Sequence, residues 1–364
     1  MPTPARIAIL PEGSDTLRVD EITLPDPGPH QVLVKIFSTG LCHSQLHEIH
    51  EHRTNDVMLG HEATGEILAA GAEVDHVVMG DRVIIGGIPR TIEAPTRRPE
   101  SARVEEAGGR VALCQGVYTW ADHVLLDELY VVKVPGDTRP DVSCVVGCAV
   151  MTGAGAVVNT AKVRAGQSVA IFGAGGVGLC TIAAARIAGA DPIIAVDLAD
   201  EKLEAAKRHG ATHLVNASNE DAVEAVRALT RSDTERDMAG LPVAGVDVAF
   251  DCIGTDVTAR QILPATRTKP LGVDGQGQAI LVGIPADDFP VSPLDLFLHE
   301  KKLTGTLAGS CRPDRDIPLF LEWFERGELD LDALVTRRYT LDDINDAIAA
   351  LSKGEIEGRA IIEF

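Results

Sequence analysis

Three residues with metal-binding side chains, Cys42, His61 and Cys148, stand far apart in a chain of 364 residues. Two thiolates and one imidazole are typical ligands of a catalytic zinc ion, which keeps a fourth position open for water or substrate. Such an ion acts as a Lewis acid and lowers the pKa of a bound alcohol, so that an alkoxide forms near neutral pH. Spacing alone leaves Cys144 open as an alternative to Cys148, and a lone cysteine is more often a small buried apolar side chain.

A glycine-rich segment indicates a second kind of chemistry. It reads Gly173-Ala174-Gly175-Gly176-Val177-Gly178. The first glycine permits a tight turn, the second lets backbone N–H groups approach a pyrophosphate, and the last lets the following helix pack on a sheet. Asp197 ends the next predicted strand, 19 residues after Gly178, and can accept hydrogen bonds from the ribose hydroxyls of adenosine. Its charge opposes a 2′-phosphate and no arginine follows directly, so the pattern favours NAD over NADP, with a purely structural turn as the alternative.

Short β-branched runs separated by glycine and proline occupy the region before residue 150 and predict a mainly antiparallel β region. These runs are Val32–Phe37, Gly65–Ala69, Asp81–Ile85, Asp122–Leu126 and Tyr130–Val134. Residues 90–110 are polar and poor in apolar side chains. That stretch predicts a long surface loop or lobe.

From about residue 167, apolar strands alternate with helical patterns, which predicts a parallel, doubly wound sheet. The predicted strands are Ser168–Gly173, Ile193–Asp197, His213–Asn216, Val246–Asp251 and Ala279–Gly283. The predicted helices are Val177–Gly189, Asp200–His209, Asn219–Thr230 and one after Gly254. Beyond residue 307, we expect helices over Ile317–Arg326 and Leu341–Lys353 and a closing strand over Arg359–Phe364.

Composition narrows the function classes. The chain has 33 Lys+Arg against 54 Asp+Glu, a formal net charge of −21, which disfavours nucleic acid and membrane surfaces as partners. It contains no 18-residue apolar run, and its first residues lack the pattern of a signal peptide, so we expect a cytoplasmic protein. Seven cysteines, an odd number, favour free thiols over a disulfide framework. The length suits two domains.

The motifs together resemble the zinc-dependent alcohol dehydrogenases of the medium-chain dehydrogenase/reductase family. The resemblance rests on Cys42-His43-Ser44, Gly60-His61-Glu62-Ala63-Thr64-Gly65, the Gly147-Cys148 stretch with Thr152-Gly153, the glycine-rich turn and the closing strand, in that order. It implies an α/β fold in which a Rossmann doubly wound parallel sheet (151–307) accompanies a GroES-like, mainly β catalytic domain (1–150 and 308–364).

The same resemblance implies roles for individual residues. Cys42, His61 and Cys148 would hold one catalytic zinc ion, and Glu62 would be a carboxylate that can approach the metal during ligand exchange. Ser44 would take the proton of the alcohol. His47 would pass it on through the cofactor ribose, since a hydroxyl both donates and accepts and a histidine titrates near working pH.

Further residues would contact the cofactor. The resemblance places His43 and Arg359 at its pyrophosphate, although a plain salt bridge is the alternative for Arg359. It places Thr152 and Val177 behind the nicotinamide ring. Lys202 corresponds to a position at a cofactor ribose, and the backbone of Val282 and Gly283 to one beside the nicotinamide amide.

The sequence departs from the family in two places. Many members carry a lobe with four closely spaced cysteines that hold a structural zinc ion, but the matching region, roughly 90–114, contains only Cys114. One thiolate cannot form a closed tetrahedral site, so we expect no structural zinc. Gln45 stands where the family usually has aspartate, and a neutral amide should make His61 a less basic ligand.

The sequence therefore favours an NAD-dependent zinc alcohol dehydrogenase that interconverts an alcohol and its aldehyde or ketone. One alternative is a formaldehyde dehydrogenase acting on a thiol adduct. Another is a nicotinoprotein that holds NAD throughout turnover, since the stretch from Gly309 to Arg338 resembles such proteins. A non-catalytic NAD-binding protein or a metal-free quinone-type reductase would not need the Cys/His/Cys set. The family also implies a homodimer or homotetramer.

Overall fold

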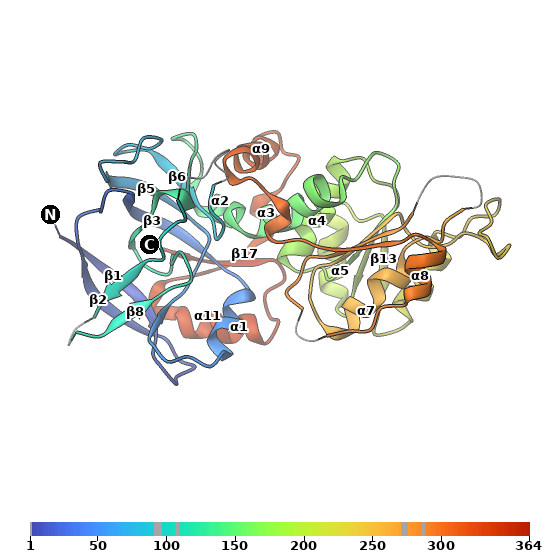
Figure 1. Cartoon of the computed structure of the whole chain (residues 1–364), viewed down its shortest axis with the longest axis horizontal. Coiled ribbons are helices and arrows are strands. Elements are labelled where there is room, and N and C mark those ends of the chain that lie inside the picture. The colour runs from blue at the N-terminus through green and yellow to red at the C-terminus, as the bar shows by residue number, and fades with distance from the viewer. Residues whose placement is uncertain (1, 91–96, 107–108, 271–275, 286–287) are drawn as a thin grey trace. The chain divides into compact units, whose positions relative to one another are not determined.

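A computed structural model describes residues 2–90, 97–106, 109–270, 276–285 and 288–364 of the chain (Figure 1). The chain divides into two units. The first comprises Met1–Ala149, Arg312–Arg326 and Asp330–Phe364, and the second comprises Val150–Cys311 and Gly327–Leu329.

The first unit is built on two mainly antiparallel sheets. Within the described residues, the larger sheet has the strand order β10-β6-β5-β3-β18-β17, with β9 paired to β3. Its strands are β3 (Gln31–Leu41), β5 (Ala63–Ala70), β6 (Arg82–Ile85), β9 (His123–Asp127), β10 (Val131–Lys133), β17 (Val335–Tyr339) and β18 (Arg359–Glu363). The smaller sheet has the order β2-β1-β4-β8-β7. Its strands are β1 (Thr3–Leu10), β2 (Arg18–Leu24), β4 (Val57–Met58), β7 (Arg103–Glu105) and β8 (Val111–Leu113).

Strand β3 positions the metal-binding residues of the first unit. Buried Val32, Val34 and Ile36 anchor it in the core. The strand pairs antiparallel with β5, which leads out of His61, and with β18, in which Ala360 faces Leu41. The chain after Leu41, the chain before β5 and the start of β18 therefore meet at one end of the sheet.

Helices cover these sheets. Those of the first unit are α1 (Ser44–His50), η1 (Glu128–Tyr130), α2 (Pro140–Ser143), η2 (Cys144–Gly147), α9 (Pro313–Glu325), α10 (Leu331–Leu334), η5 (Leu341–Asp343) and α11 (Ile344–Ser352). Buried Ile344, Ala347 and Leu351 of α11 join a core cluster with Ile49 of α1, which fixes α1 against the sheet.

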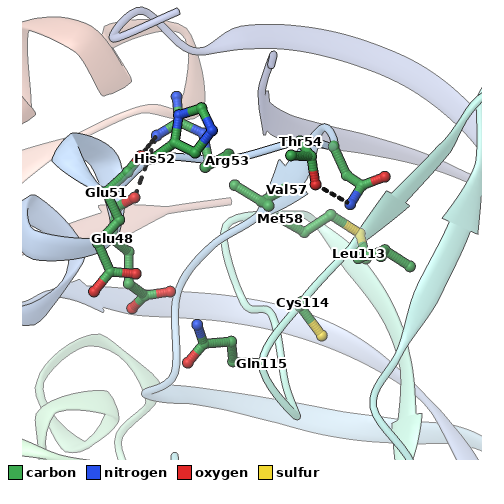
Figure 2. A pocket seen from close by; sticks show the side chains of 11 residues that line it. Glu48, Glu51, His52, Arg53, Thr54, Val57, Met58, Leu113, Cys114 and Gln115 are labelled. Atoms are coloured by element: carbon green, nitrogen blue, oxygen red, sulfur yellow. Dashed lines mark hydrogen bonds between the residues drawn. The ribbon is translucent and has the colours of Figure 1, made fainter. Parts of the chain in front are cut away.

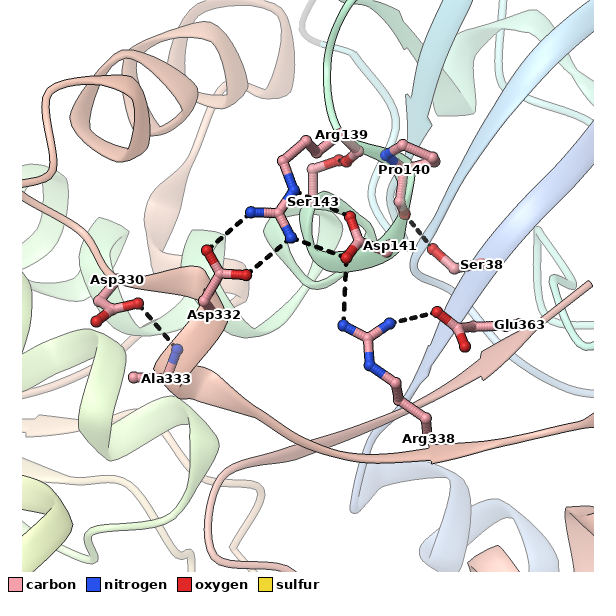
Figure 3. Close-up of polar contacts among 10 residues, drawn as sticks. All are labelled: Ser38, Arg139, Pro140, Asp141, Ser143, Asp330, Asp332, Ala333, Arg338 and Glu363. Atoms are coloured by element: carbon pink, nitrogen blue, oxygen red, sulfur yellow. Dashed lines mark hydrogen bonds and ion pairs between the residues drawn. The ribbon is translucent and has the colours of Figure 1, made fainter.

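Exposed ion pairs tie the C-terminal strands to α2 (Figure 3). Arg139 contacts both Asp141 and Asp332 at 2.8 Å, and Arg338 contacts Asp141 at 3.2 Å and also Glu363. Pairs of this kind are individually weak, and their effect comes from being joined in a network.

The second unit is a parallel sheet covered by helices. The strand order in the described residues is β13-β12-β11-β14-β15-β16, and every neighbouring pair is parallel. The strands are β11 (Val169–Phe172), β12 (Ile193–Asp197), β13 (His213–Asn216), β14 (Val248–Asp251), β15 (Gln278–Leu281) and β16 (Lys302–Gly305). The helices are α3 (Ala149–Gly155), which begins at the last residue of the first unit, the π-helix η3 (Ala156–Ala161), α4 (Gly176–Ile187), α5 (Asp200–His209), α6 (Ala222–Leu229), α7 (Asp256–Ala265), α8 (Pro293–Leu298) and η4 (Ala308–Ser310). The predicted doubly wound parallel sheet and mainly β region are both confirmed.

Several predicted element bounds differ from the structure; helix α6, for example, is Ala222–Leu229 where Asn219–Thr230 was predicted. Helix α9 begins at Pro313, four residues before the predicted start, because proline is favourable in the first turn of a helix. Within residues 90–110, predicted as a loop or lobe, the described part contains β7 (Arg103–Glu105), which pairs antiparallel with β8 (Val111–Leu113), while 91–96 and 107–108 lie outside the described residues.

Among the described residues, none of the helices is by itself long and apolar enough to cross a membrane. A bent pair, Pro140–Gly147 with Ala149–Ala161, meets the criteria of length and composition when its two helices are taken together.

Candidate functional site

Cys42, His61 and Cys148 converge in the first unit. One ligand atom from each lies within 4.8 Å of the other two. His61 Nε2 is 3.3 Å from Cys148 Sγ, which is 3.8 Å from Cys42 Sγ, although the two cysteines are 106 residues apart in sequence. Two sulfur atoms and one nitrogen atom at this spacing are a suitable donor set for zinc.

Each of the three metal-binding residues lies at the end of a different strand or helix. Cys42 follows β3, His61 precedes β5, and Cys148 follows η2. The Cys42 N–H donates to Gln45 Oε1 at 2.8 Å, which closes the turn from β3 into α1, and Gln45 Nε2 lies 2.5 Å from His61 Nδ1. Gln45 is fully buried. It therefore links two of the three metal-binding residues.

The structure distinguishes Cys148 from Cys144, the alternative that the sequence left open. Cys144 is fully buried and lies outside the three-residue group. Burial raises the pKa of its thiol to about 12. That thiol is an inert core side chain.

The two sulfur atoms of the group titrate together. The hydrogen bond from Cys148 lowers the pKa of Cys42 well below its usual value, and the same bond, together with burial, raises the pKa of Cys148. Burial opposes the charged form of His61, yet the hydrogen bond and charge of Cys42 raise the pKa of the imidazole. The hydrogen bond between the two sulfur atoms therefore favours one thiolate within the pair, and a thiolate is the form that binds metals.

Glu62 lies behind the group in a buried ion pair. Its Oε1 accepts from Arg359 Nη2 at 2.6 Å and its Oε2 accepts from the Ala149 N–H at 3.4 Å. Burial raises the pKa of Glu62, while the carboxylate raises the pKa of Arg359 despite its burial. Gly40 is required here, because a Cβ at that position would lie 2.5 Å from the Glu62 carboxyl carbon. Sequence reasoning missed Gly40, and its place two residues before Cys42 was the only available signal.

The structure places the predicted relay residues on one helix. Ser44 and His47 are three residues apart in α1, so they share a face. Ser44 Oγ lies 3.5 Å from His61 Nε2, and Ser44 is partly buried whereas His47 is exposed. The pair leads from the metal-binding residues towards solvent. His43, the residue before the helix, is also exposed.

A cavity of about 330 Å³ lies beside α1 (Figure 2). It is lined by Glu48, Glu51, His52, Arg53, Thr54, Asn55, Val57, Met58, Leu113, Cys114 and Gln115. The Arg53 guanidinium donates hydrogen bonds to backbone oxygen atoms, including those of Glu48 and Ile49. Burial raises the pKa of Glu48, which also senses the charges of His61 and Cys42. The lining contains two carboxylates, Glu48 and Glu51, and one guanidinium, Arg53, and none of the three metal-binding residues.

The glycine-rich turn of the second unit has the predicted form. It joins β11 to α4, and Gly173 has a φ of +95°. A Cβ on Gly178 would lie 1.8 Å from the Gly173 carbonyl oxygen, whereas a Cβ on Gly175 would meet nothing within 4 Å. Gly178 is thus needed for packing, and Gly175 leaves space where a pyrophosphate would approach the helix N-terminus formed by Gly176 and Val177.

Asp197 stands at the end of β12, beside this turn. Its Oδ2 accepts from the Ala174 N–H at 2.8 Å and its Oδ1 accepts from the Leu198 N–H at 2.8 Å. These bonds fix the carboxylate at the C-terminal edge of the sheet, where dinucleotides bind in doubly wound folds.

The remaining predicted cofactor residues of the second unit come from several elements. Lys202 lies in the first turn of α5, after Asp197, and is partly exposed. The N–H groups of Val282 and Gly283 both donate to the Asp251 carbonyl at 2.9 Å, directly after β15. Thr152 is a partly buried residue of α3. Val177, in α4, is partly exposed too.

Asp75, His76 and Glu128 form the other group of three metal-binding side chains in the described part of the chain. Glu128 already has cationic and imidazole neighbours, since it contacts Arg97 at 2.9 Å and His30 at 3.1 Å. These contacts make it a component of an ion-pair cluster.

Comparison with known proteins agrees with this geometry. Residues 28–136 match the model of the alcohol dehydrogenase GroES-like domain, and residues 176–326 match the model of zinc-binding dehydrogenases. The chain is 31% identical over 376 residues to the S-(hydroxymethyl)glutathione dehydrogenase of Paracoccus denitrificans, covering 96% of this chain and 97% of that one.

Solved structures resemble the whole chain as well. An alcohol dehydrogenase zinc-binding domain protein from Burkholderia ambifaria matches with a TM-score of 0.87 at 27% identity, covering 100% of both chains. Benzyl alcohol dehydrogenase from Acinetobacter calcoaceticus matches with a TM-score of 0.85 at 28% identity, covering 100% of this chain and 99% of that one.

The fold and the Cys/His/Cys group define a zinc-dependent oxidoreductase. The chain belongs to the zinc-binding alcohol dehydrogenases of the medium-chain dehydrogenase/reductase family. The resemblance seen in the sequence and the predicted enzyme class are both confirmed.

Proposed function

We propose that this protein transfers hydride between an alcohol and NAD, with Cys42, His61 and Cys148 holding one zinc ion. The observation that carries the proposal is the convergence of these three ligand atoms within 4.8 Å. Zinc held there would supply Lewis acidity, which lowers the pKa of the substrate hydroxyl. Buried Glu62 and Arg359 would balance the charge behind the ligands.

Ser44 and His47 would move the proton that the alcohol loses. Ser44 Oγ would accept it, because a hydroxyl can accept and donate at once, and His47 would pass it to solvent. Their order in α1, from partly buried to exposed, supports that direction.

The second unit would bind NAD through backbone and side chains. The turn from Gly173 to Gly178 would hold the pyrophosphate. Asp197 and Lys202 would contact the adenosine ribose, with Asp197 excluding a 2′-phosphate. Thr152, Val177 and the backbone of Val282 and Gly283 would border the nicotinamide ring.

Two cationic or polar side chains of the first unit complete the proposed cofactor contacts. The family resemblance assigns His43 and Arg359 to the pyrophosphate. Among the described residues, Arg359 Nε is buried without a hydrogen-bond partner, so the guanidinium keeps a donor although it pairs with Glu62.

A single zinc ion per chain remains our proposal. In the described part of residues 90–114, ion pairs stand where relatives of this family carry a metal-holding lobe. Arg97 contacts Asp127 at 2.5 Å, and Glu106 contacts Arg18, which also reaches Asp56 at 3.2 Å. These buried carboxylates would hold the lobe without metal.

An activity screen tests this function. Primary, secondary and amino alcohols, and S-(hydroxymethyl)glutathione, are each assayed with NAD and with NADP. We expect NAD reduction with an alcohol, a kcat/KM for NAD about 100-fold above that for NADP or more, and a loss of this preference in Asp197→Ala. No NAD reduction with any alcohol, or a preference for NADP, would contradict the proposal. Activity that ignores added NAD in protein carrying one bound NAD would favour the nicotinoprotein alternative.

We also propose a homodimer joined through β16, one of the two edge strands of the parallel sheet in the described residues. Phe297 and Leu307, near this strand in sequence, are each 80% exposed, and an exposed strand edge favours pairing with another copy. Light scattering after size exclusion should show a dimer for the native chain and a monomer for Phe297→Asp. A native monomer would contradict this assembly.

A further inference from the structure

Three hydroxyl groups of the second unit, those of Thr160, Thr306 and Ser310, form a cluster that joins two distant segments. Thr160 Oγ1 lies 2.8 Å from Thr306 Oγ1 and 2.9 Å from Ser310 Oγ, and the last two atoms are 3.0 Å apart. A hydroxyl group donates one hydrogen bond and can accept two. Each member of this hydroxyl cluster can therefore donate to one neighbour and accept from the other. Thr160 belongs to the π-helix η3, a rare form of helix that is frequent at functional sites.

The hydroxyl cluster holds a turn whose backbone conformation is unfavourable. The three residues of η4, Ala308, Gly309 and Ser310, have φ angles of +47°, +67° and +54°. Two of them carry a Cβ, for which a left-handed conformation is unfavourable and persists only where surrounding contacts fix it. Thr306 precedes η4 and Ser310 ends it, so the hydroxyl group of Thr160 connects both ends of the turn.

The turn packs against two elements that lead to the proposed nicotinamide site. The Thr306 N–H donates to the last carbonyl of β15 at 3.0 Å, directly before Val282. A Cβ at Gly309 would lie 2.2 Å from the carbonyl oxygen of Met151 in α3, directly before Thr152. Val282 and Thr152 are the residues that would border the nicotinamide ring. The turn therefore lies between the segments that carry them.

The turn also keeps backbone donors that a ligand could use. The Ser310 N–H donates to the Leu307 carbonyl at 3.0 Å, and the Cys311 N–H donates within η4. Within the part of the chain that the structure describes, the N–H groups of Ala308 and Gly309 donate to no protein acceptor, and Gly309 is buried. Because a buried backbone N–H is nearly always paired, these two donors indicate that a bound molecule contacts the turn.

We propose that Thr160, Thr306 and Ser310 are positioning residues, which fix η4 in its left-handed form so that the turn holds the nicotinamide end of NAD. The proposal rests on the proposed function, in which the second unit binds this cofactor. The hydroxyl groups bond to one another and act through the backbone of η4. Losing one of them should therefore weaken binding of the nicotinamide ring and spare the adenosine half, which would be held beside Asp197.

Two ligands distinguish the halves of the cofactor. ADP-ribose has the adenosine, both phosphates and the second ribose of NAD but lacks the nicotinamide ring. Calorimetry on nucleotide-free protein measures the Kd of each ligand. We expect Thr160→Val, which keeps the shape of the side chain, to raise the Kd for NAD about 5–10-fold, as loss of a hydrogen bond does, and the Kd for ADP-ribose less than about twofold. Thr160→Ser keeps the hydroxyl group and should bind NAD as the native chain does.

Two further variants complete the test. Ser310→Ala removes a hydroxyl group from the other segment and should raise the Kd for NAD to a similar extent. Thr234→Val alters an exposed residue between α6 and β14 and should change neither Kd. An equal rise for both ligands in Thr160→Val, or a Thr160→Ser variant as weak as Thr160→Val, would overturn the proposal. Circular dichroism establishes that each variant is folded before it is titrated.

The outcomes also distinguish this inference from the proposed function. A native chain that binds neither NAD nor ADP-ribose would contradict the proposed function and the inference together. A native chain that binds both, with no selective loss of NAD affinity in Thr160→Val and Ser310→Ala, would contradict the inference alone.

Discussion

The glycine-rich turn and the metal-binding group are held in place by different forces. The turn is a local structure of six residues, in which a positive φ at Gly173 and the absence of side chains determine the shape. The group is made of buried side chains from three distant segments, and each of its charges is balanced by a neighbour such as Arg359. Backbone shape should therefore control cofactor binding, whereas charge balance should control the metal site.

The largest effect is expected from a substitution that removes one of the three metal-binding residues. Cys148→Ala should lose zinc and lower kcat/KM about ten-thousandfold, since Lewis-acid stabilisation of developing charge contributes several kcal/mol. Cys144→Ala, which removes a buried thiol outside the group, should keep zinc and most activity. Metal content and kinetics of the two variants provide the measurement. Equal zinc loss in both would contradict the assignment.

The charge balance behind the ligands is expected to show the next largest effect. Glu62→Gln leaves Arg359 buried without its carboxylate, and breaking a buried ion pair on one side should lower the free energy of unfolding by about 3 kcal/mol. Urea denaturation of the zinc-free protein at neutral pH measures this change in the free energy of unfolding. The exposed control Glu73→Gln should change it by less than about 0.5 kcal/mol. No difference between the two variants would show that the pair does not stabilise the fold.

Substitutions at two glycines of the turn distinguish the packing of the helix from the binding of the cofactor. Gly178→Ala should destabilise the second unit by about 1–3 kcal/mol, because its Cβ would clash with the Gly173 carbonyl. Gly175→Ala should keep the melting temperature but raise the Kd for NAD about tenfold, since its Cβ would occupy the space that the pyrophosphate approaches. Calorimetry and NAD titration test both. A Gly175→Ala variant that binds NAD normally would place the pyrophosphate elsewhere.

The smallest effect is expected from the exposed ion pairs at α2, in which Asp141 contacts Arg139 and Arg338. Burial acts against the charge of Asp141, but the hydrogen bond and charge of Arg139 lower its pKa below the usual 3.8. The ion pair therefore stabilises the fold fully at pH values above the pKa that Asp141 has in the unfolded chain. This stabilisation is lost as the pH falls below about 3.8.

Asp141→Asn should therefore lower the free energy of unfolding by less than about 1 kcal/mol at pH 7, and by progressively less as the pH falls through 3.8. Asp137→Asn, an exposed neighbour, serves as the matched control. A difference between Asp141→Asn and the native chain that does not change with pH would exclude the ion pair as its cause.

The local parts of the molecule were predictable because their signals are contiguous. The α5 helix has the predicted bounds, Asp200–His209, since acidic residues begin it and Gly210 ends it. The β7–β8 hairpin was missed because each strand has three residues, too few for an alternating pattern.

The metal-binding group could not be assembled from spacing. Resemblance to a family selected Cys148 over Cys144, and only the fold shows why, because one lies with Cys42 and His61 and the other in the core. Contacts that depend on a close approach, such as that of Gly40 to Glu62, are likewise visible only once the strands are paired. The domain limits near residues 150 and 308 and the cofactor roles of single residues stay predictions.

The ligand environment of the bound zinc is the most direct test of the central claim. X-ray absorption spectroscopy of the purified protein, with its metal content measured in parallel, reports the number and type of atoms around the metal. We expect one zinc ion per chain with two sulfur ligands, one histidine nitrogen and one oxygen atom from water. Zinc held only by four sulfur ligands would contradict the Cys42, His61 and Cys148 site, and two zinc ions per chain would contradict the metal-free lobe.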